Sequence, residues 1–523
     1  MMEENAVNPS TPLKPDWSVI TVIIIGVFMA ILNGSIVNVA LPKIMSIFNA
    51  TPDSIQWVLT SYMMTLGVLM PISGYLGDTF GYKRMYFMAL AIFVFGSLLC
   101  ACSWSVNSMV AARIVQAVGG SIMQPLGMAF IYRVTPRQQM GLTMGIFGIA
   151  AMAAPAIGPT LGGYLVEYVN WRLIFLINVP IGIMNLFLTT ILLKETELVK
   201  GHLFDHTGLV SSVIGLFCLL LALSQGNKHG WSSAYIISLI TIASISLTIF
   251  VINELRHPEP ILELRLFKNY LFTISTVVGA VINIGMFGAM FLLPLLLQNV
   301  LGQTAMKTGI ILLPAALATA VMMPVSGKWF DKHGARGVVV PGLILVTWTT
   351  YMISRFDLYT SFTVMSAWMV LRGMGMGLCM MPVTTIGMNT IPMHLMGRGS
   401  ALGNVIRQVA AALGIAMFTS IMQNRQVFHY ADMAQLVNMN SNEGLALQPL
   451  LYNMAASQGW DISVAQVLGL SLIAKQVTQL SAMKAIQDCF IIASAICLLA
   501  TVLSFYLRSR NTSPAQEVNE AQM

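Results

Sequence analysis

Charged residues are scarce in this chain. Asp, Glu, Lys and Arg make up 9% of its 523 residues, while apolar residues make up 56%. A water-soluble protein of this length cannot cover its surface with so few charges. None of the 20 acidic residues falls at the centre of a long apolar run. These absences exclude a soluble enzyme and argue against an intramembrane acid pair.

The sequence also lacks the patterns of common catalytic and metal sites. It contains no Gly-x-x-x-x-Gly-Lys-Ser/Thr loop, no His-Glu-x-x-His and no Gly-x-Ser-x-Gly, which argues against ATP drive and against the usual hydrolases. The cysteines show no metal-like spacing beyond one Cys-x-Cys, so we interpret them as packing residues. They are Cys100, Cys102, Cys218, Cys379, Cys489 and Cys497. We expect no cofactor, no metal and no enzymatic activity.

About fourteen apolar runs are long enough to span the hydrocarbon core of a bilayer. They lie near residues 17–40, 56–76, 85–103, 108–132, 141–166, 173–193, 208–224, 234–252, 271–298, 306–327, 338–354, 361–387, 400–421 and 486–506. The sequence therefore predicts an all-α polytopic membrane protein.

The net charge of +7 is explained by topology. If the N-terminus is cytoplasmic, the inner segments hold 16 of the 27 Lys and Arg residues and the outer segments hold 8. This asymmetry follows the positive-inside rule and predicts that both termini are cytoplasmic. It also makes nucleic acid an improbable partner. Because Glu3, Glu4 and Asp16 precede the first run, we expect that run to be an anchor and not a cleaved signal.

One charged signature occurs twice, 253 residues apart. It reads Gly-x-x-x-Asp-x-x-Gly-x-cation, at Gly74, Asp78, Gly81, Lys83 and Arg84, and again at Gly327, Asp331, Gly334 and Arg336. That separation exceeds what six helices need, so two extra helices are expected between two halves of six. The predicted organisation is a segment at 1–16, a first half at 17–193, a linker with two helices at 194–257, a second half at 258–506 and a tail at 507–523.

The predicted second half includes an outer loop at 422–485, polar at first and amphipathic later. A loop of that length usually has its own structure or a partner. The alternative is a passive hairpin lying on the membrane surface.

The duplicated signature resembles that of the major facilitator superfamily, and fourteen helices resemble the drug:proton antiporters of the EmrB/QacA type. Further motifs match that family from about residue 17 to 506. They are 32-LNGSIVNVALP-42, 154-APAIGPTLGG-163, Trp171-Arg172, 204-FDHTG-208, 223-LSQG-226 with Gly230-Trp231, and 487-QDCF-490. The resemblance implies the facilitator fold, proton-coupled export of amphipathic drugs, a bacterial inner membrane and, where an outer membrane exists, an adaptor of the EmrA type.

Three arginines fall inside predicted helices, where a charge costs about 2.5 kcal/mol or more. Arg113, followed by Gln116, resembles the family motif whose arginine is linked to proton coupling, although Ala117 replaces the usual glycine. It either faces the central cavity or pairs with backbone carbonyls. Arg372 and Arg407 either contact substrate or make buried polar contacts.

Small residues and prolines mark the fifth helix, at Pro155, Gly158, Pro159, Gly162 and Gly163. In the family this pattern is typical of antiporters, and we expect a close but flexible contact between the two halves. The alternative is simple small-residue packing.

The signature acids predict a latch at the cytoplasmic face. Asp78 is expected to meet cations such as Arg133 or Arg137 and to accept hydrogen bonds from the N-terminus of a neighbouring helix. Asp331 with Arg336 is expected to form a weaker counterpart in the second half. The alternative is that these charges only set topology.

Asn33 departs from the family pattern, which has an aspartate at this position. An amide cannot exchange a proton near neutral pH, so proton coupling is implied only by the resemblance. Asp488 is the nearest alternative for titration. We interpret the chain as an exporter of amphipathic drugs. The alternative is an exporter of a lipid, fatty acid or metabolite with different coupling, and a membrane enzyme or sensor is disfavoured.

Overall fold

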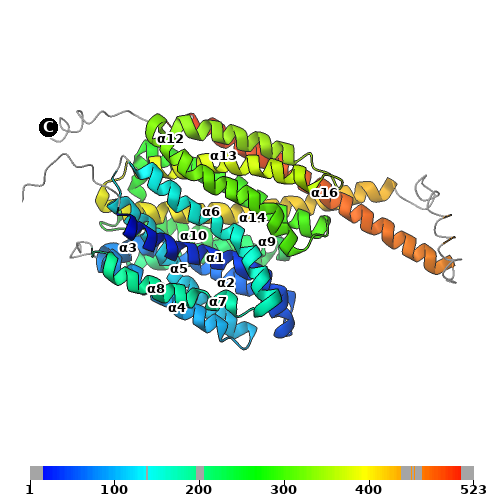
Figure 1. The fold of residues 1–523 in the computed structure, drawn as a ribbon, viewed down its shortest axis with the longest axis horizontal. Helices are drawn as coiled ribbons and strands as arrows, with labels where there is room; N and C mark the ends of the chain where they lie inside the picture. The colour runs from blue at the N-terminus through cyan, green and yellow to red at the C-terminus, as the bar shows by residue number, and fades with distance from the viewer. Residues whose placement is uncertain are drawn as a thin grey trace, which may run out of the picture.

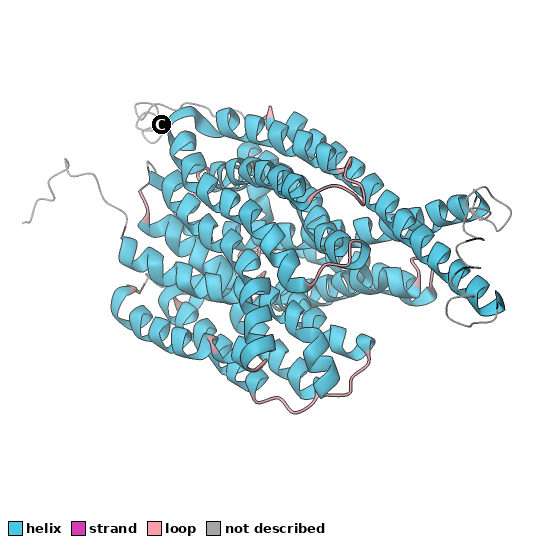
Figure 2. Ribbon diagram, turned by 45° about the vertical axis from the view of Figure 1, so that its right-hand side comes forward, coloured by secondary structure: helices cyan, strands magenta, loops and turns pink. Residues whose placement is uncertain are grey.

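The computed structural model describes residues 16–136, 139–195, 205–436, 449, 453 and 462–507. These residues form an all-helical bundle, and no strand occurs among them (Figures 1 and 2). The first half contains α1 (Trp17–Ile47), α2 (Pro52–Leu69), α3 (Ile72–Phe80), α4 (Tyr82–Ala101), α5 (Val106–Val134), α6 (Met140–Tyr164), α7 (Leu173–Leu176) and α8 (Asn178–Leu192).

Two linker helices, α9 (His206–His229) and α10 (Ala234–Arg256), follow, and a short helix η3 (Leu264–Lys268) leads into the second half. That half contains α11 (Tyr270–Leu295), α12 (Ala305–Ile353), α13 (Phe362–Met388), α14 (Met396–Leu436) and α16 (Ile462–Ser504). The predicted all-α membrane architecture is confirmed. Twelve helices in the described ranges are long and apolar enough to span a bilayer, and the bent pair α2 and α3 makes a thirteenth.

The count of fourteen depends on α12. This helix covers 49 residues, or roughly 75 Å at the α-helical rise, which is more than twice the hydrocarbon thickness. Its backbone leaves helical geometry at Gly334, where φ is 72°. Counting the parts before and after that break as separate spans would give the predicted fourteen.

The two copies of the signature adopt the same local structure. In the first, α3 ends and α4 begins at Gly81, whose φ is 92°; in the second, the break in α12 lies at Gly334. Side chains rarely adopt such positive φ values, and glycine adopts them freely. Each glycine follows its acid, Asp78 or Asp331, by three residues, so the signature places each acid within one turn of a helix break.

Polar side chains define several helix starts. Thr51 caps α2, Ser105 forms a capping box with Ser108 on α5, and Asp205 accepts from the Gly208 amide at the start of α9. These caps satisfy amide groups that have no partner within the helix.

Most of the expected outer loop at 422–485 is helical. α14 continues to Leu436 and α16 starts at Ile462. Figure 1 shows both helices projecting beyond the rest of the bundle, at the end opposite to where α1 begins and α16 ends. Each extension continues its helix, so this part of the chain has helical structure of its own. We call these two projections the α14/α16 hairpin.

Candidate functional site

Arg113 on α5 is completely buried in the first half. Its Nε donates to the Val58 carbonyl on α2 at 3.2 Å, and its Nη1 donates to Gln116 Oε1 at 2.8 Å. The guanidinium lies 3.9 Å from the centroid of the Tyr62 ring. No carboxylate pairs with it among the described residues. In this conformation Arg113 therefore joins α2 to α5 through a backbone carbonyl.

Gln116 extends this contact to α4. Its Nε2 donates to Ser97 Oγ at 2.6 Å, and the Cys100 thiol lies 3.7 Å from its Oε1. The helices can approach this closely because a Cβ at Gly96 would lie 2.5 Å from the Gln116 backbone. The polar chain from Val58 to Ser97 thus crosses three helices in the apolar interior, where each hydrogen bond is strengthened by low polarity.

Asn33 on α1 is also buried, with 1% of its surface exposed. It lies beside the Tyr62 hydroxyl, which donates to the Ala30 carbonyl, and neither amide atom of Asn33 forms a well-oriented hydrogen bond. A buried amide without a partner costs roughly 1–3 kcal/mol. Asn33 therefore lies beside the hydroxyl of Tyr62 and Arg113 lies over its ring, so the two sequence-predicted residues meet at Tyr62, a residue that sequence reasoning missed.

Arg407 and Arg372 occupy different surroundings in the second half. Arg407 on α14 donates to Asn404 Oδ1 at 2.8 Å and reaches Met128 of the first half at 3.9 Å. It lines a cavity of about 20 Å³ with polar residues of α11 and α13, including Ser275 and Thr384. Arg372 on α13 is buried and donates to Thr350 Oγ1 at 3.2 Å. Only Arg407 therefore lies between the halves.

Asp488 is paired at the base of the α14/α16 hairpin. Its Oδ2 lies 2.6 Å from Arg425 Nε and 2.8 Å from His429 Nε2. The structure does not bring it together with Asn33 or Arg113, because it lies on α16 near the projecting end.

Asp78 contacts both halves, at the position of the predicted latch. It lies 3.6 Å from Arg133 Nη2 on α5 and 3.4 Å from Arg398 Nε at the start of α14, and it accepts from the Tyr82 hydroxyl at 2.8 Å. The expected contact with Arg133 is confirmed, while Arg137 lies outside the described residues. Both Asp78 and Arg398 are more than nine-tenths buried, so this ion pair is little screened by solvent.

The second acid also binds the opposite half, by a different contact from the one expected. Asp331 Oδ1 accepts from the Gly141 amide at the start of α6, at 3.2 Å. No ion pair joins Asp331 to Arg336 in the described part of the chain, and Arg336 lies over the Phe505 ring. The predicted pairing of Asp331 with Arg336 is therefore wrong. The partner of Asp331 is instead the N-terminus of α6, which carries the partial positive charge of the helix dipole.

Lys83 and Arg84 stay within the first half. Lys83 Nζ donates to the Thr190 carbonyl at 2.8 Å, and Arg84 Nε lies 3.6 Å from Glu195. These two signature cations fix α4 to the end of α8 and do not pair with Asp78.

Glycines allow the two halves to touch backbone to backbone. A Cβ at Gly74 would lie 2.9 Å from the Gly397 carbonyl, and one at Gly327 would overlap the Gly141 carbonyl. Ser400 of α14 also donates to the Pro125 carbonyl at 3.1 Å. These contacts and both acid contacts gather at the end of the bundle where α1 begins. That end is closed in this conformation.

Gly327→Ala is expected to weaken closure, because its methyl group would overlap the Gly141 backbone. We expect a three- to tenfold lower transport rate and greater labelling of a cysteine placed between the halves at this end. Gly337→Ala is the matched control on α12, since a Cβ there meets only His333 Cβ, at 3.3 Å. Equal labelling of both variants would contradict the role of the Gly327 contact.

The small residues of α6 pack differently from expectation. Gly158 and Gly162 approach Ser35 and Ile36 of α1, within the same half. The contact between halves is made earlier in α6, where a Cβ at Gly145 would lie 2.7 Å from the Met323 carbonyl of α12. The predicted contact of the Gly158 motif with the other half is therefore wrong.

The sequence profile of the Major Facilitator Superfamily matches residues 23–415. The chain belongs to this superfamily. It is 36% identical over 507 residues to the MFS-type transporter YhcA of Bacillus subtilis (strain 168), covering 97% of this chain and 94% of YhcA. It is 32% identical to the lincomycin resistance protein LmrB of Listeria innocua, covering 76% and 85% of the two chains, and 32% identical to the multidrug transporter protein MdtP of B. subtilis, covering 78% and 75%.

Among solved structures, the human organic anion transporter MFSD10 (TETRAN) superposes with a TM-score of 0.63 at 14% identity, covering 95% of this chain and all of that one. This likeness concerns the fold alone. The facilitator is thus a multi-pass membrane transporter, as the resemblance implied.

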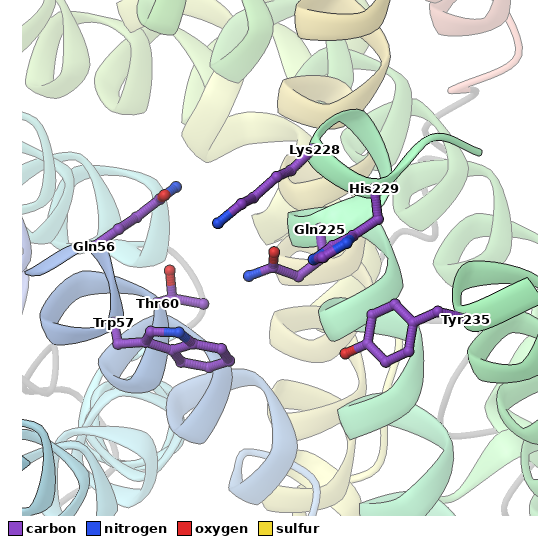
Figure 3. A pocket seen from close by; sticks show the side chains of 7 residues that line it. All are labelled: Gln56, Trp57, Thr60, Gln225, Lys228, His229 and Tyr235. Carbon is purple, nitrogen blue, oxygen red and sulfur yellow. The ribbon is translucent and has the colours of Figure 1, made fainter. Parts of the chain in front are cut away.

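One cavity of this facilitator was not predicted from the sequence. It has a volume of about 140 Å³ and lies between α2 and the linker helices. Figure 3 shows Gln56 and Lys228 pointing toward one another, with the Trp57 and Tyr235 rings below them. Aromatic faces beside amide and amine groups suit an amphipathic molecule. The 223-LSQG-226 motif includes Gln225, which lines this cavity, and was the sequence feature that could have indicated it.

Proposed function

We propose that this facilitator is a secondary exporter of amphipathic compounds in a bacterial inner membrane, working by alternating access and driven by protons. The observation that carries the proposal is the pair of acid contacts. Each signature acid binds the opposite half at the same end, Asp78 through Arg398 and Asp331 through Gly141. Breaking both would open that end while the other closes.

The relatives named for lincomycin and multidrug resistance support an amphipathic drug as cargo. The aromatic cavity at α2 and α9 would bind such a molecule transiently during export. If an adaptor of the EmrA type exists, the α14/α16 hairpin is its natural docking site, because it projects farthest from the bundle (Figure 1).

Transport in liposomes tests the proposal. Purified protein in liposomes with an imposed pH gradient should move ethidium against its gradient, and an ionophore that collapses the pH gradient should stop it. Protein-free liposomes give the leak rate. Ethidium movement that ignores the pH gradient would contradict proton-coupled export.

A second candidate cargo is an anionic amphiphile such as a fatty acid. The small cavity between the halves is lined by Arg407 and by no acid among the described residues, and Asn33 replaces the acid of the family pattern. A cavity with a cation and no acid attracts anions. The same liposomes loaded with a fluorescent fatty acid distinguish the two cargoes.

Arg407→Gln separates these cargoes further. Since Arg407 faces the small cavity between the halves, its loss should raise the KM for an anionic cargo about tenfold, the effect of roughly 1.4 kcal/mol. The KM for ethidium should stay within about twofold. Initial rates over a range of concentrations measure both, and an equal change for the two cargoes would assign Arg407 a structural role.

A further inference from the structure

A cluster of polar side chains lies where α9 begins and α10 ends, apart from the residues that carry the proposed function. It is built by residues 205–208, the end of α10 and the chain leading into η3. Three of its acids are more than nine-tenths buried: Asp205 is 2% exposed, Glu254 is not exposed and Glu263 is 7% exposed. With Asp78, they are the buried carboxylates of the described residues.

Two of these acids have evident partners. Asp205 accepts from the Gly208 amide at 2.7 Å and from Asn253 Nδ2 at 2.6 Å. Glu263 lies 3.8 Å from Arg265. Asp205 is therefore bound by a capping amide and a side-chain amide, and Glu263 lies beside a cation.

Glu254 differs from them. Its Oε2 accepts from the Leu262 amide at 3.2 Å, and its Oε1 has neither a hydrogen bond nor a cation within 4 Å among the described residues. Oε1 points toward Asp205, because the position of a Cβ at Gly208 would lie 2.9 Å from it and also against Asp205 Oδ2. A fully buried, unpaired carboxylate next to a second carboxylate is costly, whereas a carboxylic acid there is not.

The cluster is in electrostatic contact with the latch. The charged groups that act on Glu254 are Asp205 from the start of α9, Glu263 before η3 and Arg398 from α14. Arg398 is the residue that binds Asp78 across the halves. Its neighbour Gly399 packs near Leu266 of η3, so the start of α14 lies beside both Asp78 and the short helix that follows Glu263.

We propose that Glu254 is a proton-binding site whose occupancy is linked to the latch at this end. With the latch closed, Glu254 carries a proton on Oε1 and Arg398 stays with Asp78. When the latch opens, water reaches Glu254, the proton leaves to the solution at that end, and the Glu254 carboxylate becomes a second partner for Arg398. Because closure then binds one proton, a lower pH at this end favours the closed conformation.

This proposal deepens the proposed function, but its test needs no transport. Pairs of spin labels between the halves at this end report the ratio of closed to open molecules in detergent. For the unaltered protein, that ratio should fall as the pH rises, by up to tenfold per pH unit for one proton.

Glu254→Gln is the decisive variant. The amide keeps the shape and the acceptor for Leu262 but cannot exchange a proton, so the ratio should stay near the closed limit and lose its dependence on pH. Asp357→Asn, in an exposed loop between α12 and α13, should keep the response of the unaltered protein.

A Glu254→Gln variant with an unchanged pH response would overturn the proposal, and so would an unaltered protein with no response. Either result can occur whether or not the liposomes transport ethidium. A failure of this inference is therefore distinguishable from a failure of the proposed export function.

Discussion

Arg113→Ala is expected to lower gradient-driven transport by at least about 100-fold. The change removes two hydrogen bonds from a charged donor, worth about 1.5–3 kcal/mol each, and a buried contact with Tyr62, worth about 2 kcal/mol. A loss of about 2.8 kcal/mol, less than that total, already corresponds to 100-fold. The initial rate of ethidium movement in liposomes measures the effect.

Thermal stability should change less than these contacts suggest. Arg113 is a buried cation without a carboxylate partner in the described structure, so its removal also relieves a desolvation cost of several kcal/mol. Arg113→Lys is the matched control, because it keeps the charge over Tyr62 but cannot hold Val58 and Gln116 together; we expect about a tenfold loss. Full transport by the alanine variant would refute a role for this link between α2 and α5.

Asp78→Asn is expected to open the latched end. The amide keeps the size of the side chain and removes the charge that faces Arg133 and Arg398. Removing one partner of a buried ion pair costs about 3–5 kcal/mol, so the ratio of closed to open molecules should fall by about 100-fold or more. Spin-label distances between the halves at this end give the ratio directly.

Asp331→Asn provides the comparison within the same fold. Asp331 accepts from an uncharged amide, that of Gly141, and a neutral acceptor retains most of such a bond, which is worth about 1 kcal/mol. We expect a change of about fivefold or less. Equal effects of the two substitutions would show that the Asp78 charge does not dominate closure.

The helices could be predicted because lipid requires long apolar runs, and the predicted starts of α4, α5 and α6 lie within three residues of the observed ones. The α14/α16 hairpin could not be predicted in this way, because the residues after 421 become polar and hydropathy no longer marks the helix. There the helical signal lies in backbone propensity and in contacts between α14 and α16, such as the pair of Arg425 with Asp488.

The candidate site was predictable where partners are close in sequence or lie at the same end of neighbouring helices in one half. Arg113 with Gln116 and Asp78 with Arg133 follow from helix spacing and from the position of the signature. Arg398 binds Asp78 from 320 residues away, and Glu254 meets Asp205 only because α9 and α10 return to the same end. Such pairs depend on the packing of helices, which composition and periodicity do not specify.

A single helix, α14, carries three of the arginines described above. α14 holds Arg398 at the closed end, Arg425 in the hairpin and Arg407 between them, over 41 residues, or about 60 Å of helix. A tilt of about 10° at the closed end would swing the far tip by roughly 10 Å over that length. The projecting end of α14 would therefore move whenever the closed end opens. An antibody fragment that holds this end in place should stop the transport cycle without touching the substrate path.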